Sequence, residues 1–205
     1  MSSPDFFAAA PRLTVTDPLA EFLGAAQGGV LDYSYLDAVK LAGHSCPTVA
    51  GAYLATVRAL RWLYPDHPPV RGQIAVQFRA GQEEGVTGVM AAVVGLLTGA
   101  AGVGGFKGIA GRFARHDLLQ FGADIPLELR FIRLDNDSAV DVALHLSRVP
   151  ADPALRDCLG AALGDTATPS VRQQFAALWQ QRVLRILVDQ VDDPGLVEVR
   201  PVSRP

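Results

Sequence analysis

The sequence predicts an α+β domain, close to an α/β arrangement, in which helices pack on a mixed, mainly antiparallel sheet. Apolar residues recur at helical spacing over residues 47–64 and 86–97. Polar and apolar residues alternate over residues 73–79, 127–134 and 140–146, which is the period of a strand with one buried face. Because helices and strands are interleaved before a helical last quarter, we expect one principal domain with a helical C-terminal segment.

The first long helix is expected to run from Pro47 to Tyr64. Its apolar residues recur at helical spacing: Val49, Tyr53, Val57 and Leu60. Proline is favoured at the first position of a helix, because the N–H that it lacks would have no partner there. Cys46 therefore falls at or beside the N-cap of this helix.

A second helix and a hairpin follow. The helix carries one apolar stripe, made of Val86, Val89, Met90, Val93 and Leu97. A glycine-rich stretch from Gly99 to Gly111 then ends it. The last two alternating segments are separated by Asp135-Asn136-Asp137-Ser138, whose residue types favour turns. We expect an antiparallel hairpin there.

These patterns divide the chain into three parts. Residues 1–27 contain scattered prolines and a single short strand-like run, so we expect an N-terminal arm or edge strand. Residues 28–150 form the expected core domain. Residues 151–205 form the helical C-terminal segment, with helices expected from Asp152 and Thr168 and a short strand at the end. The second of these helices is amphipathic and suits either the chain's own core or a second copy of the chain, and we expect a homodimer.

The composition excludes several classes of protein. With 205 residues, of which 49% are hydrophobic, the chain can bury a sizeable core. Only 19% of residues are charged and the formal net charge is −3, so the basic surface of a nucleic-acid-binding protein is missing and no nucleic-acid partner is expected. Residues 1–7 have neither the cationic start nor the apolar run that is typical of a secretory signal, and later apolar runs are interrupted by glycine or charge. We therefore expect a cytoplasmic protein with no membrane partner.

The cysteine content excludes one kind of zinc site. Cys46 and Cys158 are more than a hundred residues apart and are expected to stay reduced in the cytoplasm. A structural zinc ribbon needs four close ligands, usually from two Cys-x-x-Cys pairs. Because the sequence contains no such pair, we exclude a zinc ribbon.

The segment Gly43-His44-Ser45-Cys46-Pro47 is the leading candidate for a functional centre. Unpaired N–H groups at the start of a helix favour the thiolate form of cysteine, and His44 lies two residues from Cys46. This arrangement suits a catalytic pair with Cys46 as nucleophile, or a metal site. The alternative is structural, because free cysteine is among the most buried residue types and a histidine near a helix start often only donates a hydrogen bond.

Two motifs resemble a known family. Residues 37–53 read Asp-Ala-Val-Lys-Leu-Ala-Gly-His-Ser-Cys-Pro-Thr-Val-Ala-Gly-Ala-Tyr and resemble the segment that opens the FmdE family of formylmethanofuran dehydrogenase components, in which His-Gly-His-x-Cys-Pro-Gly is typical. Residues 97–107 read Leu-Thr-Gly-Ala-Ala-Gly-Val-Gly-Gly-Phe-Lys and resemble the family's Leu-Thr-Gly-Cys-Thr-x-Gly-Lys-Gly-Asn-Leu. The resemblance covers residues 28–122.

The chain departs from the family pattern at two site positions. Ala42 stands where the family has the first histidine, and Ala100 stands where it has the cysteine of the second motif. Only His44 and Cys46 carry over. The zinc-binding C-terminal module of longer members is missing, since no cysteine follows Cys158. The chain therefore resembles the divergent stand-alone members of the family, whose activity is unsettled.

A divalent metal, with zinc as the first candidate, is expected at His44 and Cys46. Two protein ligands are too few for a closed structural site, which usually takes four. A further ligand is expected from Glu84, which follows Glu83 at the start of the second helix, or from His116. The alternative is that these glutamates are solvated and complement the helix dipole.

The glycine-rich loop is a second candidate binding element. It contains neither a Gly-x-Gly-x-x-Gly motif nor a Gly-Lys-Ser/Thr ending, so a nucleotide site of either kind is not expected. Lys107 and Arg112 are candidates to bind the carboxylate or phosphate of a small ligand, with Arg115 and His116 nearby in sequence. The alternative is tight packing with solvated basic side chains.

Two functional hypotheses from different classes follow. The first is a small-molecule-binding or metal-binding protein of the FmdE type, in which His44 and Cys46 line a pocket and the glycine-rich loop forms another wall. An enzyme that uses Cys46 as metal ligand or nucleophile is one version of it. The second is a non-catalytic accessory or chaperone-like protein, in which Cys46 only caps and packs the first long helix.

Overall fold

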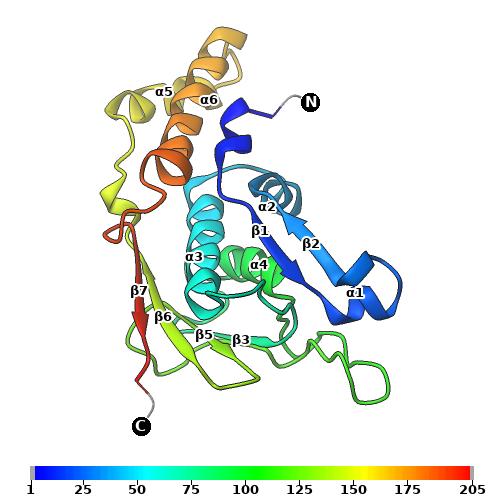
Figure 1. The fold of residues 1–205 in the computed structure, drawn as a ribbon. Helices are drawn as coiled ribbons and strands as arrows, with labels where there is room; N and C mark the ends of the chain where they lie inside the picture. Colours follow the sequence, from blue (N-terminus) through cyan, green and yellow to red (C-terminus); the bar gives the residue numbers. More distant parts are fainter. Residues whose placement is uncertain (1–2, 204–205) are drawn as a thin grey trace.

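The computed structural model describes residues 3–203, and within them the predicted α+β class is confirmed (Figure 1). The α-helices are α1 (Pro18–Phe22), α2 (Tyr35–Ala42), α3 (Pro47–Leu63), α4 (Thr87–Thr98), α5 (Pro153–Leu163) and α6 (Pro169–Leu184). The strands are β1 (Leu13–Thr16), β2 (Val30–Tyr33), β3 (Ile74–Phe78), β4 (Leu119–Gln120), β5 (Leu129–Arg133), β6 (Ala139–Leu144) and β7 (Val197–Pro201). Short 3-10 helices lie at Asp5–Ala9, Gln27–Gly29 and Leu146–Arg148, and α6 continues into a π-helical turn at Arg185–Asp189.

The strands form two sheets. The larger sheet has the order β4-β3-β5-β6-β7, and its only parallel pair in the described chain is β3 with β4. This confirms the prediction of a mixed, mainly antiparallel sheet. The predicted hairpin is β5 and β6, in which Leu129 pairs with Val142 and Phe131 with Val140. All four side chains are fully buried, so one face of the hairpin covers the core.

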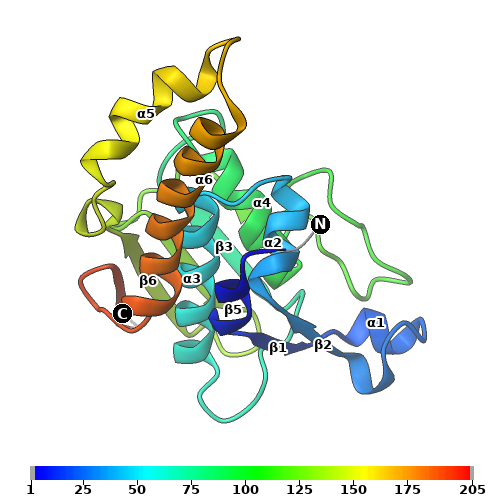
Figure 2. The same ribbon diagram turned by 90° about the horizontal axis from the view of Figure 1, so that it is seen from above.

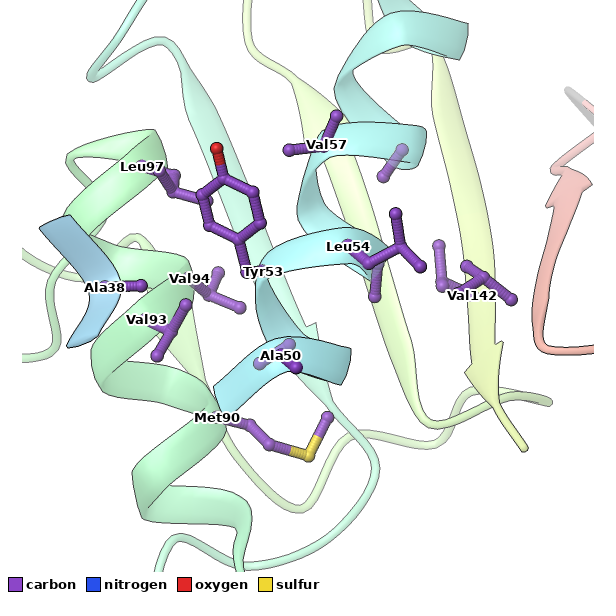
Figure 3. Close-up of a cluster of buried hydrophobic side chains, with 14 of the residues drawn as sticks. Ala38, Ala50, Tyr53, Leu54, Val57, Met90, Val93, Val94, Leu97 and Val142 are labelled. Carbon is purple, nitrogen blue, oxygen red and sulfur yellow. The ribbon is translucent and has the colours of Figure 1, made fainter. Parts of the chain in front are cut away.

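Helix α3 is the centre of the molecule. Thirteen of its seventeen residues are buried, because elements pack around it on several sides. Figure 3 shows α3 between α4 and the sheet, with Tyr53 on the side of Val94 and Leu97 and Leu54 on the side of Val142. The predicted helical stripe therefore understated the burial of this helix, since it described only one apolar face.

The N-terminal third is more ordered than the sequence patterns indicated. The expected edge strand is β1, which pairs antiparallel with β2 and buries Val15 completely. Neither β2 nor α2 was predicted, because residues 28–41 mix apolar and aromatic residues without one clear period. A local signal for the start of α2 does exist, since the Asp37 carboxylate accepts a hydrogen bond from the Ser34 N–H at 2.8 Å. Residues 1–2 of the expected arm lie outside the described part.

The C-terminal segment places a long helix beside the core. Figure 1 shows α5 and α6 as a helical pair on the side of the molecule opposite the C-terminus, and Figure 2 shows α6 next to α3. Both helices begin at the predicted residues, with Asp152 and Thr168 as N-caps. The final strand is β7, which pairs with β6. Within residues 3–203, no helix is both long enough and apolar enough to cross a membrane.

Candidate functional site

A cleft of about 510 Å³ lies between the N-terminal 3-10 helix, α2 and α6. Its lining residues come from these elements and from the connection between α2 and α3: Ser3, Pro4, Phe7, Leu36, Val39, Lys40, Gly43, His44, Ser45 and Gln180. Clefts of this size that are mostly apolar with a few polar groups are typical of small-ligand sites. The candidate segment is therefore at a cleft, with His44 in its wall, whereas Cys46 and the glycine-rich loop are not among the lining residues.

The connection from α2 to α3 is a sharp reversal centred on Gly43. Gly43 caps α2 in the left-handed conformation, with φ at 75°, and its N–H donates to the Val39 carbonyl at 2.8 Å. Side chains other than glycine rarely adopt this conformation. The turn therefore ends α2 abruptly and places His44 and Ser45 at the cleft before α3 begins.

His44 presents one ring nitrogen to the surroundings of the cleft. Its side chain is exposed, and Nδ1 lies 2.9 Å from the Ala42 carbonyl oxygen. Because a carbonyl oxygen only accepts, Nδ1 must carry the proton in this contact. In the neutral ring Nε2 is then an acceptor that can bind a ligand proton or a metal ion.

Cys46 points into the protein. It is the N-cap of α3, as predicted, and its Sγ accepts a hydrogen bond from the Val49 N–H at 3.4 Å. Only 9% of the residue is exposed, and it packs with the hydrophobic core. These contacts are those of a capping and packing residue, which is one of the two roles considered for Cys46 from the sequence.

Ser45 is fixed by residues that lie far from it in sequence. The Trp179 indole N–H donates to the Ser45 carbonyl at 2.9 Å, and the Gln180 amide N–H donates to the same oxygen at 3.2 Å. The Ser45 hydroxyl donates to Gln180 Oε1 at 2.9 Å and lies 2.9 Å from the Tyr35 hydroxyl. Because the Ser45 hydroxyl donates its proton to Gln180, the Tyr35 hydroxyl must be the donor in its contact with Ser45. Helices α2 and α6 thus hold the cleft wall together.

Tyr35 is a neutral hydrogen-bond donor at the base of this network. Burial raises the pKa of Tyr35 above its ordinary value, the hydrogen bond with Ser45 lowers it, and the nearby Cys46 raises it. The side chain also packs edge-on against Phe7 and Tyr53. A phenol in these surroundings stays protonated, so it positions Ser45 and does not act as a base near neutral pH.

Glu84 lies at a different pocket. It accepts a hydrogen bond from the Gly81 N–H at 3.3 Å and lines a pocket of about 290 Å³ beside β3 and the start of α4. His116 contacts Asp117, with 2.5 Å between Nδ1 and Oδ2. Across residues 3–203, no three His, Cys, Asp or Glu side chains gather as a group that could hold a metal ion. His44, Cys46 and Glu84 are therefore not brought together as one ligand set.

Lys107 and Arg112 are exposed in the glycine-rich loop. The Arg112 guanidinium lies over the Phe113 ring, with 5.0 Å from Cζ to the ring centroid, and Phe113 stacks on Phe22. Figure 2 shows the loop in green, extending outward from the body of the molecule. The loop presents these cations to solvent and not to the cleft that contains His44.

The loop is anchored at its end by a buried ion-pair cluster. Asp17 accepts from Arg115 Nη2 at 2.6 Å and from Arg71 Nη1 at 2.9 Å, and it also caps α1. Burial alone raises the pKa of Asp17, but the hydrogen bonds from Arg71 and the Ala20 N–H and the charge of Arg115 outweigh it and hold the pKa below its ordinary value. A Cβ at Gly72 or Gly99 would collide with the Arg115 guanidinium, so both positions require glycine.

Ser45, Trp179 and Gln180 were missed as site residues. Ser45 was part of the candidate segment but was assigned no role, and its partners on α6 lie more than 130 residues away in sequence. No local pattern reports such a contact. The one available signal was that Trp179 and Gln180 are adjacent residues with polar N–H groups on a predicted helix, which is weak on its own.

Comparisons with known proteins assign no family to the chain. No family model and no curated protein sequence matches it.

Proposed function

We propose that this protein binds a small molecule in the cleft between α2, α6 and the N-terminal 3-10 helix. The observation that carries the proposal is the convergence of His44, Ser45 and Gln180 on the wall of a cleft of about 510 Å³. Ligand sites combine an apolar lining with a few polar groups held in fixed positions. Ser45 is held in this way by Tyr35 and Gln180.

The apolar part of the cleft supports the same proposal. Phe7, Leu36 and Val39 contribute apolar surface, and the chain packs all three against the core. Burying an apolar ligand against such surface contributes about 25 cal/mol for each Å² removed from water. A rigid wall adds to affinity because little conformational entropy is lost when the ligand binds.

The test uses Trp179 as the reporter. The chain has two tryptophans, and Trp62 is 46% exposed, so Trp62→Phe leaves Trp179 as the only one. Titration of this protein with octan-1-ol should change the Trp179 emission in a saturable way. Val39→Phe fills part of the cleft and should weaken binding about ten-fold, by crowding the ligand.

Val89→Phe is the matched control, because Val89 is an exposed residue on α4 outside the cleft. It should leave the affinity for octanol unchanged. Binding at this site would be ruled out if Val39→Phe and Val89→Phe weakened the affinity for octanol equally. It would also be ruled out if the Trp62→Phe protein, whose cleft is unchanged, showed no saturable change of emission.

Metal binding at His44 and Cys46 stays a prediction of the sequence, as does membership of the FmdE family. His44 supports it through Nε2, which is not used in the contact with Ala42. Metal analysis after purification without an affinity tag tests the prediction. It requires that wild type carry about one equivalent of zinc or another divalent metal and that His44→Ala and Cys46→Ala lose it.

The alternative of a non-catalytic protein in which Cys46 is structural is favoured by the burial of Cys46 and by its hydrogen bond with Val49. Cys158 is half-buried and serves as an internal reference. A structural Cys46 should react with iodoacetamide more slowly than Cys158 in the folded protein. A nucleophilic Cys46 would react faster, since reactivity follows thiolate character and access.

A further inference from the structure

The lining of the cleft contains one cationic side chain and no acidic one. Among its lining residues, all from the described part of the chain, none is Asp or Glu, and Lys40 is the only Lys or Arg. Ser45 and Gln180 use their polar groups largely on each other. Lys40 is therefore the lining residue with most hydrogen-bonding capacity left for a ligand.

Lys40 is only loosely held by the protein itself. Its side chain is 69% exposed, and Nζ lies 3.9 Å from Asp37 Oδ1, which is longer than a hydrogen bond. Asp37 itself is held at the start of α2, where the Ser34 backbone N–H donates to its other carboxylate oxygen, Oδ2, at 2.8 Å. The ammonium group can therefore turn toward a ligand without breaking a strong contact, and it gains a charge-assisted hydrogen bond if that ligand is an anion.

We infer that the ligand is a small amphipathic monoanion, with an apolar body against Phe7, Leu36 and Val39 and a terminal carboxylate beside Lys40. This inference rests on the proposed function, because it assumes that the cleft is a binding site. The C-terminal end of α2 carries partial negative charge and opposes an anion, so the contribution of Lys40 is needed to offset it.

The test compares three probes with the same chain length and different charge: octanoate, octan-1-ol and octyltrimethylammonium, all below their micelle concentrations. Each is titrated into the Trp62→Phe protein and followed by Trp179 emission. Octanoate should bind about ten-fold more tightly than octanol, which corresponds to one charge-assisted contact. The cationic probe should bind most weakly.

Lysine variants then identify which side chain binds the carboxylate of octanoate. Lys40 and Lys107 are the only lysines in the sequence. Lys40→Gln should remove the preference for octanoate over octanol, whereas Lys40→Arg should keep it. Lys107→Gln changes the same residue type in the glycine-rich loop and should keep the preference as well. Circular dichroism and the urea midpoint of each variant check that the fold is intact.

The outcomes separate the two proposals. If octanol binds as tightly as octanoate and Lys40→Gln changes neither affinity, the inference about charge is wrong while the proposed binding site stands. If the preference depends on Lys107 instead, the anion binds at the loop and the inference is overturned. If none of the three probes binds, the proposed function itself fails.

Discussion

The segment Gly43–Pro47 and the glycine-rich loop were both expected to form walls of one site, and they are built differently. In the structure this loop connects α4 to β4 over residues 99–118. In the first, the backbone and side chain of Ser45 are held by Trp179 and Gln180 of α6. In the second, the buried contact is concentrated at Arg115, while Val103, Phe106 and Ile109 are exposed. The first segment lines a cleft, and the second extends into solvent beside α1.

The difference shows that glycine content alone does not make a binding loop. The loop contains three non-glycine residues in the left-handed region, Ala110, Phe113 and Asp117, with φ at 49°, 63° and 60°. Such residues cost free energy and persist where surrounding contacts hold them. Here the loop is held by the Arg115 anchor and by backbone hydrogen bonds of its own, such as that from the Ala101 N–H to the Arg115 carbonyl at 2.9 Å. At Gly43, by contrast, the left-handed position is a glycine, and the neighbouring Ser45 is held by α2 and α6.

The largest expected effect comes from breaking the loop anchor. Asp17→Asn leaves Arg71 and Arg115 without their shared carboxylate, and Arg115 is 7% exposed. Removing one partner of a buried ion pair costs about 3–5 kcal/mol, because an uncompensated charge stays buried. Urea unfolding should show this loss, and trypsin should cut faster after Lys107 and Arg112.

Asp32→Asn is the control for this change. Asp32 pairs with Arg12 on the surface, where both side chains are about half exposed. The expected loss in the free energy of unfolding is much smaller than for Asp17→Asn, because solvent screens an exposed pair. A loss of similar size for Asp17→Asn would mean that the anchor contributes little and that the loop is held by other contacts.

The second-largest loss of stability is expected at Trp179, which together with Gln180 holds the α2–α3 connection at Ser45. Trp179→Ala removes the hydrogen bond to the Ser45 carbonyl and the ring contact with Phe175. Because Trp179 is only half-buried, the expected loss in the free energy of unfolding is about 2 kcal/mol, which is less than for a fully buried tryptophan. Trp62→Ala, an exposed position on α3, should cost less than half as much. A reversed order would contradict the role given to α6.

A smaller effect is expected at Ser45 itself. Ser45→Ala removes the acceptor of Tyr35 and the donor to Gln180, so both partners lose a hydrogen bond in half-buried surroundings. We expect a loss of about 1 kcal/mol in chemical denaturation and a weaker binding of octanol, because the cleft wall is less fixed. Ser138→Ala removes an exposed hydroxyl that donates to Asn136 and should cost less than about 0.5 kcal/mol.

The two regions should also lose their contributions to the free energy of unfolding at opposite ends of the pH range. The pKa of Asp17 is lowered on folding, so its contribution to stability is present above the ordinary value of 3.8 and is lost as the pH falls through the folded value. The pKa of Tyr35 is raised by burial, so its contribution is present below 10.0 and is lost as the pH rises through the folded value. Urea midpoints measured from about pH 2.5 to about pH 11 test both directions.

Two variants assign these transitions. Asp17→Asn should flatten the acid limb, and Tyr35→Phe should reduce the alkaline limb, in which Tyr53 also takes part because burial raises the pKa of Tyr53 as well. An acid limb unchanged by Asp17→Asn would show that the loop anchor is not the group that titrates.

Most of the secondary structure could be predicted because its periods and caps are local. Helices α3, α4, α5 and α6, strand β3, the β5–β6 hairpin and the N-cap position of Cys46 follow from apolar spacing, proline placement and turn residues. Strand β2 and helix α2 were not predicted, because the apolar and aromatic residues there show no single period.

The surroundings of the candidate residues could not be predicted, because they depend on tertiary packing. It directs Cys46 to the core and His44 to a cleft, and it places Glu84 and Lys107 elsewhere. It also supplies Gln180 and Trp179, whose contacts with Ser45 span more than 130 residues. The physical reason is that a short segment specifies its own backbone through local hydrogen bonds and sterics, whereas side-chain direction, burial and convergence depend on which distant helix packs against it.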